Sequence, residues 1–223
     1  MTTLLAVLFD MDGTLTDSEK LWTVALDRTA ADLGGRLSGP SRRAMVGHNL
    51  IDSITMLLAD IGSERAPAAA AELLTRHTAE LFAQPMPWRP GADDLLQAVR
   101  EAGLATALVT ATERSLVELA LKTLGHNTFD AVVCGDEVTR NKPDPEPYQR
   151  AMELLEVSAT ECVAVEDSPN GSLSALRAGL PVLVVPSEVE VAAAAGLTFA
   201  DSLTDVSVDT LRAMRADSVP LPS

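Results

Sequence analysis

The clearest hydrophobic pattern in the chain is a short apolar run at residues 4–9, which two aspartates and a glycine follow. An apolar run of this length without alternation is typical of a strand buried on both faces of a parallel sheet. Asp10 and Asp12 come where that strand should end, and the carboxyl ends of parallel strands are where α/β proteins bind ligands. The pattern therefore places both carboxylates where chemistry is expected.

After this strand the hydrophobic spacing becomes helical. We predict four helices. The first runs from the N-cap candidates Asp17 and Ser18 to Gly34, and a short second helix ends at Gly47. The third runs from the N-cap Asn49 to Gly62, and the fourth covers residues 67–82. Because no convincing strand interrupts them, residues 16–84 are predicted to form a helical bundle, a cap inserted directly after the first strand. Residues 1–15 and 85–223 are then expected to form the core.

From residue 93 onward, apolar runs alternate with helical spacing. Strands are predicted at residues 104–110, 131–134, 162–165 and 181–185, with helices at about 93–103, 113–125, 146–155 and 172–178. Such alternation indicates βαβ units, and with the first strand it gives some five strands. The expected fold class is α/β, a Rossmann-like parallel-sheet core with an inserted helical cap. The tail should contain a short helix near residues 208–215, and residues 218–223 should be frayed.

Charge and composition narrow the class of protein. The 223 residues include 32 acidic and 17 basic ones, a formal net charge of −15, which argues against a nucleic-acid partner. No apolar run approaches the roughly 20 residues of a membrane span, and no signal peptide is evident, so we expect no membrane association and a cytoplasmic location. Cys134 and Cys162 lie in apolar runs without metal-ligand spacing and are expected to be buried free thiols. We expect a monomer.

Three further polar clusters fall where later strands should end or beside them. They are Thr110-Ala111-Thr112, Lys142 on a proline-rich stretch, and Glu166-Asp167. Taken singly, each has an ordinary explanation: Thr112 as a helix N-cap, Lys142 as a surface charge, and the acidic pair as a polar turn. Their predicted convergence on one sheet edge favours a functional site instead.

The chemistry of such a site follows from its charges. Carboxylates crowded at about 4 Å repel one another by about 4 kcal/mol per pair at an effective dielectric of 20, so an ionised cluster requires a cation. Oxygen ligands without histidine or cysteine indicate Mg²⁺. A cation, a hydroxyl, a lysine and a helix N-terminus around one carboxylate would suit a phosphoryl group.

The motifs Asp10-Met11-Asp12-Gly13-Thr14, Thr110, Lys142-Pro143 and Glu166-Asp167, in that order, resemble the four signature motifs of the haloacid dehalogenase (HAD) superfamily. The resemblance covers nearly the whole chain and is to the subgroup with a helical cap. That subgroup holds β-phosphoglucomutases, phosphoglycolate phosphatases and sugar-phosphate phosphatases. Residues 17–22 also resemble the start of the cap in bacterial hexitol and 2-deoxyglucose phosphatases.

This resemblance implies that the protein is a Mg²⁺-dependent phosphatase that acts on a small phosphorylated metabolite. The expected substrate is a sugar or polyol phosphate. It implies that Asp10 attacks phosphorus and becomes an aspartyl phosphate, and that Asp12 protonates the leaving alcohol and later activates water. The phosphate-binding residues it implies are Thr110, Ala111 and Lys142. The metal ligands it implies are Asp10, the backbone carbonyl of Asp12, and Asp167. Glu166 would either bind the metal directly or lie just outside its ligands. Ser168 and Asn170 would orient the acidic loop.

The first alternative is a phosphosugar mutase. In β-phosphoglucomutases the cap contributes a histidine soon after the first motif and an arginine for the second phosphate of the substrate. Here Trp22 stands at the histidine position, and His48 rather than an arginine follows the glycine of the cap. Both differences favour hydrolysis, and His48, Arg42 and Arg43 are expected to be solvated surface residues.

Two other classes are less consistent with the motifs. A phospho-acceptor signalling module also uses an aspartate, Mg²⁺, a threonine and a lysine, but such receiver domains are much shorter and lack an inserted cap. A signalling switch also has no use for a general acid such as Asp12 beside its nucleophile. A dehalogenase is disfavoured because a carboxylate-rich Mg²⁺ site suits phosphate. The identity of the phosphate ester is left open, because it depends on how the cap docks over Asp10.

Overall fold

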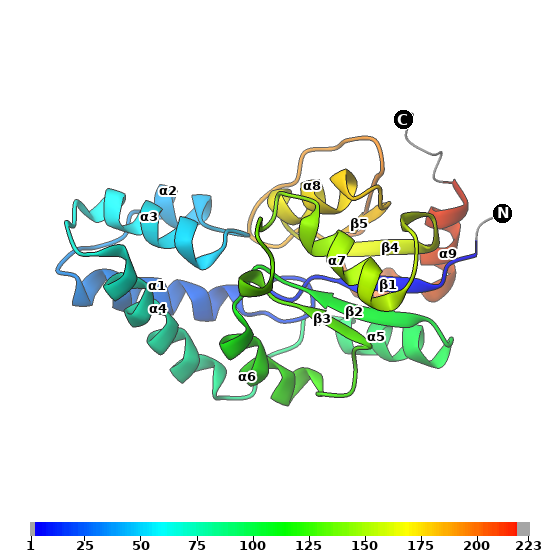
Figure 1. Ribbon diagram of the computed structural model, residues 1–223, viewed down its shortest axis with the longest axis horizontal. Helices are drawn as coiled ribbons and strands as arrows, with labels where there is room; N and C mark the ends of the chain where they lie inside the picture. Colours follow the sequence, from blue (N-terminus) through cyan, green and yellow to red (C-terminus); the bar gives the residue numbers. More distant parts are fainter. Residues whose placement is uncertain (1–2, 218–223) are drawn as a thin grey trace.

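The computed structural model describes residues 3–217, and its centre is one parallel sheet of six strands in the order β3-β2-β1-β4-β5-β6. The sheet lies at one end of the molecule and a helical bundle at the other (Figure 1). The strands are β1 (Ala6–Phe9), β2 (Ala105–Val109), β3 (Ala131–Val133), β4 (Cys162–Glu166), β5 (Val182–Val184) and β6 (Leu197–Phe199). This is the α/β fold with an inserted helical segment that the sequence predicts.

The predicted first strand lies in the middle of the sheet. β1 pairs in parallel with β2 on one side and β4 on the other, so that Phe9 lies between Leu108 and Val165. Val7 and Phe9 pack into one hydrophobic core, and Ala6 and Leu8 pack into the core on the opposite face. Burial on both faces explains why the run is apolar without alternation.

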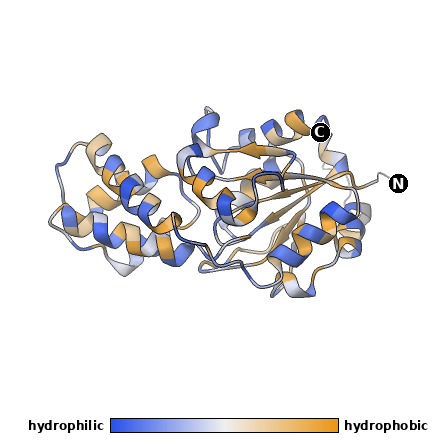
Figure 2. Ribbon diagram, turned by 90° about the horizontal axis from the view of Figure 1, so that it is seen from below, coloured by the Kyte–Doolittle hydropathy of each residue, from blue (hydrophilic) through white to orange (hydrophobic). Residues whose placement is uncertain are grey.

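Five helices cover the two faces of the sheet. They are α5 (Ala92–Glu101), α6 (Arg114–Leu124), α7 (Glu146–Leu155), α8 (Pro169–Arg177) and α9 (Val208–Asp217). Apolar residues of α5, α6 and α9 share the core of Val7 and Phe9, whereas those of α7 and α8 share the core of Ala6 and Leu8. The hydropathy colouring shows the strands as a mostly hydrophobic layer between amphipathic helices (Figure 2). Short 3-10 helices lie at Gly135–Glu137, Ala159–Glu161 and Leu203–Asp205.

The inserted bundle has a hydrophobic core of its own. Its helices are α1 (Glu19–Asp32), α2 (Gly39–Ala44), α3 (Leu50–Ile61) and α4 (Pro67–Phe82). As predicted, the Asn49 side chain accepts a hydrogen bond from the Asp52 N–H at 3.0 Å, and α3 ends at Gly62, whose φ of 64° suits glycine.

The two chain segments that join the bundle to the sheet lie side by side. The Asp17 N–H donates to the Pro87 carbonyl at 2.8 Å, and the Arg89 N–H donates to the Leu15 carbonyl at 2.9 Å. Two adjacent crossings of this kind would allow the bundle to move as a unit. The division of the chain into a core of residues 1–15 and 85–223 and a cap of residues 16–84 remains a prediction.

Two sequence predictions were wrong. The sheet has a sixth strand, β6, which pairs with β5 at the edge and which its short, half-exposed sequence does not reveal. Ser18 does not cap α1 through its side chain, because its hydroxyl is used elsewhere, in the site described below. The predicted frayed tail at residues 218–223 lies outside the described residues.

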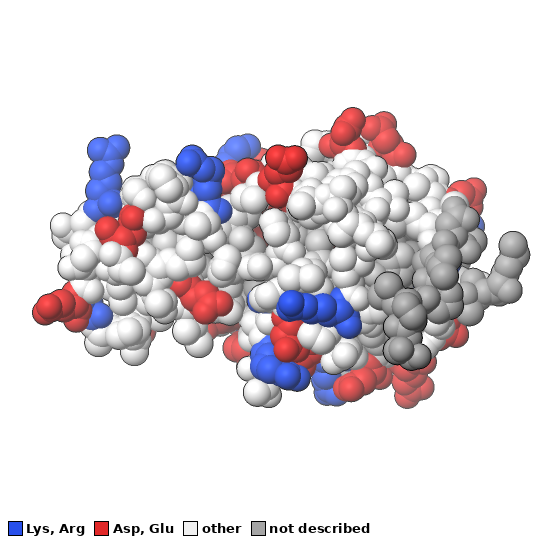
Figure 3. Space-filling view, turned by 90° about the horizontal axis from the view of Figure 1, so that it is seen from above, with Lys and Arg blue, Asp and Glu red and all other residues white. Residues whose placement is uncertain are grey.

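Other predictions about composition can be compared with the structure. Cys134 and Cys162 are buried free thiols, and burial raises the pKa of each to about 12. Within residues 3–217, no helix combines the length and the apolar character needed to cross a bilayer. On the face shown in Figure 3, basic side chains lie among acidic ones and form no continuous stripe.

Candidate active site

The carboxyl edge of the sheet gathers side chains from distant parts of the sequence. Asp10 follows β1, Thr110 follows β2, and Asp167 follows Glu166, the last residue of β4. Lys142 reaches the same place from the segment before α7, between β3 and β4. A pocket between the sheet edge and the bundle is lined by Asp10, Asp12, Thr110, Ala111, Lys142 and Asp167, so the predicted residues converge as expected. Glu166 lies behind them and is fully buried.

Lys142 is the cation at the centre of the site. Its Nζ donates to Asp10 Oδ1 at 2.8 Å, to Glu166 Oε1 at 2.6 Å and to the Val109 carbonyl at 2.8 Å. The side chain is only 4% exposed, which rules out the ordinary explanation of Lys142 as a surface charge. Burial alone would lower the pKa of Lys142, but the Asp10 and Glu166 carboxylates outweigh it and raise this pKa.

Asp10, Glu166 and Asp167 form a buried acidic triad, with one carboxylate oxygen of each within 4.8 Å of the others. Burial raises the pKa of Asp10 to about 7, and burial together with the neighbouring carboxylates raises that of Asp167. Asp10 Oδ2 and Asp167 Oδ2 are buried without a hydrogen-bond partner. Unsatisfied buried carboxylate oxygens fit a cation that would bind them, so this donor set suits a hard divalent metal.

Glu166 differs from the other two acids because its oxygens already have donors. Its Oε1 accepts hydrogen bonds from Lys142 and from the Tyr148 hydroxyl, the latter at 2.6 Å. Its Oε2 lies 3.4 Å from the Ser168 hydroxyl, which also accepts a hydrogen bond from the Gly171 N–H and so caps α8. The prediction that Ser168 contacts the acidic loop is consistent with this arrangement.

Two glycines allow the acidic side chains to approach the backbone closely. A Cβ at Gly13 would lie 2.0 Å from Asp167 Oδ2, and a Cβ at Gly171 would lie 2.0 Å from Glu166 Oε2. Gly13 also has φ of 81°, in the left-handed region that favours glycine. Any larger residue at either position would displace a member of the triad.

The carboxylate of Asp12 accepts hydrogen bonds from four side chains. Its Oδ1 accepts from the Ser18 hydroxyl at 2.6 Å and from the Trp22 indole N–H at 2.9 Å. Its Oδ2 accepts from the Thr112 and Thr110 hydroxyls at 2.7 and 3.3 Å. Asp12 is therefore oriented jointly by the bundle and by the loop after β2.

Sequence reasoning missed two of these donors. The ordinary explanation of Thr112 as a helix N-cap does not hold, because Glu113 precedes α6 and the Thr112 hydroxyl donates to Asp12. Trp22 was considered only as a replacement for a histidine. Its position ten residues after Asp12, in the first turn of the helix that follows the first motif, is the signal that could have indicated a contact.

The bundle contributes the opposite wall of the pocket, which includes Arg42 and His48. The expectation that both are simple surface residues is therefore wrong. Arg42 forms an ion pair with Asp27, and the His48 ring lies 3.4 Å from the side-chain nitrogen of Asn170. Asn170 also donates to the Gly47 carbonyl at 3.4 Å, so it contacts the bundle, a role different from the predicted one of orienting the acidic loop.

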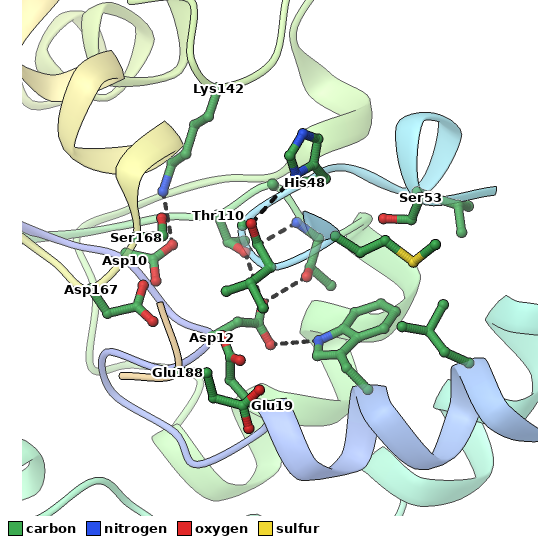
Figure 4. Close-up of a pocket in the computed structure, with 18 of the residues that line it drawn as sticks. Asp10, Asp12, Glu19, His48, Ser53, Thr110, Lys142, Asp167, Ser168 and Glu188 are labelled. Carbon is green, nitrogen blue, oxygen red and sulfur yellow. Dashed lines mark hydrogen bonds and ion pairs between the residues drawn. The ribbon is translucent and has the colours of Figure 1, made fainter. Parts of the chain in front are cut away.

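Two further acidic residues, which the sequence did not indicate, line the pocket. Glu19 begins α1, and Glu188 lies on the segment between β5 and β6. Burial and the neighbouring Glu188 carboxylate raise the pKa of Glu19 to about 8, with smaller effects from Asp12 and Asp10. The side chains of the two glutamates lie next to each other in the pocket (Figure 4).

Comparison with known proteins identifies the family. Residues 7–185 match the model of the haloacid dehalogenase-like hydrolases. The chain is 33% identical over 184 residues to a plasmid-encoded phosphoglycolate phosphatase of Cupriavidus necator, covering 81% of this chain and 80% of that protein. It is 31% identical over 191 residues to hexitol phosphatase B of Escherichia coli K12, covering 82% and 84%.

Among solved structures, a mutant of CbbY from Rhodobacter sphaeroides in complex with xylulose-(1,5)bisphosphate superimposes with a TM-score of 0.84. Its sequence identity to this chain is 30%, and the alignment covers 94% of this chain and 99% of that one. The sheet order, the inserted bundle and the buried acidic triad agree with these similarities. The chain therefore belongs to the haloacid dehalogenase-like hydrolases and is a phosphatase of that family.

Proposed function

We propose that this phosphatase hydrolyses a small phosphate monoester of a sugar or polyol, with Mg²⁺ as cofactor and Asp10 as nucleophile. The observation that carries the proposal is the environment of the Asp10 carboxylate. Lys142 holds Oδ1, while Oδ2 is buried, lacks a hydrogen-bond partner and belongs to a residue that lines the pocket. A carboxylate fixed at one oxygen and unsatisfied at the other suits both metal binding and attack on phosphorus.

In the proposed reaction an Asp10 oxygen forms a bond to phosphorus as the bond from phosphorus to the alcohol oxygen breaks. Asp12 donates its proton to that oxygen, and the alcohol leaves. Asp12 then takes a proton from water, which attacks the aspartyl phosphate and regenerates Asp10 with release of inorganic phosphate. Asp12 must change its protonation state in each turnover, and its four donors would have to yield to allow this.

The metal would be held by Asp10, Asp167 and the backbone carbonyl of Asp12. When bound, Mg²⁺ would supply positive charge that lets an anionic nucleophile approach an anionic phosphate. Glu166 would support the site indirectly, because its Oε1 already receives hydrogen bonds from Lys142 and Tyr148. Its role would be to orient Lys142.

Thr110, Ala111 and Lys142 would bind the phosphoryl oxygens. All three donors of the Lys142 ammonium are engaged, with Asp10, Glu166 and a backbone carbonyl. Lys142 would therefore have to exchange or share one of these hydrogen bonds when phosphate binds.

The relatives support a carbohydrate-type alcohol in the substrate. One is a hexitol phosphatase, another is named a phosphorylated carbohydrates phosphatase, and a CbbY mutant binds a sugar bisphosphate. A mutase is less consistent with the site, because a mutase must bind a second phosphate. The pocket-lining cations Lys142 and Arg42 are already in ion pairs.

The direct test is to measure phosphate release from a panel of sugar, polyol and nucleotide monophosphates with Mg²⁺ and after removal of Mg²⁺ by a chelator. Asp10→Asn is nearly isosteric and should abolish release while circular dichroism stays unchanged. A variant that retained even a tenth of wild-type kcat, a loss of only about 1.4 kcal/mol, would exclude Asp10 as the nucleophile. Conversion of a sugar phosphate into an isomer without phosphate release would indicate a mutase instead.

A further inference from the structure

We infer that Glu19 and Glu188 form the part of the pocket that contacts the alcohol of the substrate. This pair of carboxyl groups selects phosphate esters of neutral polyols and sugars over esters that carry a second anionic group. The inference deepens the proposed function and rests on it. It names the chemical class of the substrate and two specificity-determining residues.

The first argument is placement. Glu19 and Glu188 line the same pocket as Asp10 and Asp12, and their side chains approach each other in it (Figure 4). Glu19 is 8% exposed, whereas Glu188 lies at the exposed edge of the pocket. A substrate whose phosphate lies at Asp10 would therefore extend its alcohol past Glu19 toward Glu188.

The second argument is unused hydrogen-bonding capacity. Among residues 3–217, no N–H group and no Ser, Thr or Tyr hydroxyl is found donating to the Glu19 carboxyl; its neighbour is the other carboxyl, that of Glu188. Buried carboxyl oxygens are normally satisfied by donors, and the hydroxyl groups of a polyol are donors. The same pocket holds the unpartnered Asp10 Oδ2, which independently indicates that a ligand completes this space.

The third argument is the balance of charge. Asp10, Asp12, Glu19, Glu113, Asp167 and Glu188 line the pocket. The cations that line it are engaged: Lys142 with Asp10 and Glu166, and Arg42 with Asp27. His48 lies against Asn170. A second phosphate or a carboxylate on the substrate would meet the Glu188 carboxylate, beside Glu19, without a free cation to offset the repulsion, which is how a site rejects an unwanted ligand.

The test uses two esters that differ in a single group. Glycerol 1-phosphate ends in a hydroxymethyl group, and 3-phosphoglycerate has a carboxylate at the same place. We expect wild-type kcat/KM to favour glycerol 1-phosphate by about tenfold or more. Glu188→Gln keeps the size of the side chain and removes its charge, so it should raise kcat/KM for 3-phosphoglycerate and reduce the preference by about threefold or more, chiefly through KM.

The matched control is Glu190→Gln. Glu190 lies on the same segment and is exposed, but it does not line the pocket, so this variant should keep the wild-type preference. Because Glu188 is exposed, its repulsion should also weaken as salt is added, since the screening length is about 8 Å at physiological ionic strength. Glu19→Gln should change the preference less than Glu188→Gln, because burial and the neighbouring Glu188 carboxylate raise the pKa of Glu19 to about 8 and leave it largely uncharged at neutral pH.

The outcomes separate the two proposals. If the wild-type protein hydrolyses p-nitrophenyl phosphate with Mg²⁺ but prefers 3-phosphoglycerate, the inference about Glu19 and Glu188 is overturned and the phosphatase proposal stands. The inference is also overturned if Glu188→Gln and Glu190→Gln give the same preference. If no ester of the panel is hydrolysed, including p-nitrophenyl phosphate, both proposals fail together.

Discussion

At the scale of single residues, two carboxylates separated by one position in sequence have opposite surroundings. Asp10 is buried, faces other acids and is held by the ammonium of Lys142, with one oxygen unsatisfied. Asp12 is half-buried and has two hydrogen-bond donors on each oxygen. Similar residues can therefore serve different steps, because the environment and not the residue type sets the role of a carboxylate.

The role of Asp12 predicts a dependence on the leaving group. Asp12→Asn should lower kcat for an alkyl phosphate by about a hundredfold or more, because the leaving oxygen then lacks a proton donor. For p-nitrophenyl phosphate, whose leaving group needs no proton, the loss should be much smaller. Steady-state kinetics on both esters measures the difference, with the exposed Asp94→Asn as control. Equal losses on the two esters would refute the assignment of Asp12 as the acid.

Lys142 also predicts a stability effect. Lys142→Met would leave Asp10 and Glu166 buried without their cation, and breaking a buried pair costs about 3–5 kcal/mol of unfolding free energy. Denaturant unfolding without Mg²⁺ near pH 8 measures this loss, which should shrink at pH 5, because burial raises the pKa of Asp10 to about 7 and its carboxyl can then take up a proton.

The control for this prediction is Lys20→Met. Lys20 pairs with Asp17 at the surface, and its side chain is 76% exposed, so the effect should be small. Equal losses of unfolding free energy in Lys142→Met and Lys20→Met would show that the buried ion pairs of Lys142 stabilise the protein no more than a surface ion pair does.

At the scale of elements, the start of α1 links the inserted bundle to the chemistry. Glu19 and Trp22 line the pocket from the start of this helix, and Ser18, directly before it, donates a hydrogen bond to Asp12. Trp22 also packs edge-on against Phe82 of α4, with ring centroids 5.7 Å apart. The position of the Asp12 carboxylate therefore depends on how α1 and α4 pack, and not only on the loop that carries Asp12.

This dependence predicts the effect of Trp22→Phe. The change removes the indole N–H but keeps an aromatic ring against Phe82, so stability should change little. A hydrogen bond to a charged group contributes about 1.5–3 kcal/mol, so we expect kcat for alkyl phosphates to fall about tenfold or more. The loss should be smaller for p-nitrophenyl phosphate.

Trp88→Phe is the matched control, because Trp88 packs on the core of the sheet and makes no hydrogen bond to Asp12. Equal kcat values for wild type and Trp22→Phe on alkyl esters would show that the Ser18 and threonine hydroxyls suffice to position Asp12.

At the scale of the whole molecule, the bundle and the sheet have separate hydrophobic cores and enclose the pocket between them. The site thus combines residues from two parts of the molecule that have different proposed roles. The residues proposed to bind metal and phosphate belong to the sheet edge, whereas Trp22, Arg42 and His48 belong to the bundle. Closure of the bundle over a bound ester would exclude water, and opening would release the product.

Removing the bundle tests whether the two parts have these different roles. Residues 18–85 can be replaced by a short Gly/Ser linker, which keeps Met86 in the sheet core and the adjacent crossings at Leu15 and Arg89. In this variant the preference for the best natural substrate over p-nitrophenyl phosphate, measured as the ratio of their kcat/KM values, should fall strongly. Its Mg²⁺ affinity, measured by calorimetry, should fall less. Exposed apolar surface should make it more prone to aggregate.

A control protein with the same linker inserted between Glu64 and Arg65, in an exposed loop within the bundle, should keep both properties. Unchanged substrate preference without the bundle would show that the sheet core selects the substrate, and the division proposed here would have to be withdrawn.

The sequence alone determined the fold class and the convergence of the acidic, hydroxyl and lysine side chains at the carboxyl edge of the sheet. Strands buried on both faces are mostly apolar, so β1 and the apolar parts of β2 and β4 were visible as short hydrophobic runs, although β2 contains Thr106 and β4 ends at Glu166. Parallel strands end at one edge, so the polar residues after those strands had to converge. The edge strand β6 escaped detection because it is short and half-exposed, and its residues therefore follow no strong pattern.

Only the tertiary structure decided how the bundle completes the site. The contacts of Ser18, Trp22, Thr112 and Glu188 depend on how α1 and two loops dock, and no spacing in the chain encodes that geometry. Glu19 and Glu188 are 169 positions apart in sequence and meet only in the pocket. Local sequence fixes periodicity and caps, whereas the choice of substrate depends on side chains that become neighbours only when separately packed parts enclose the pocket.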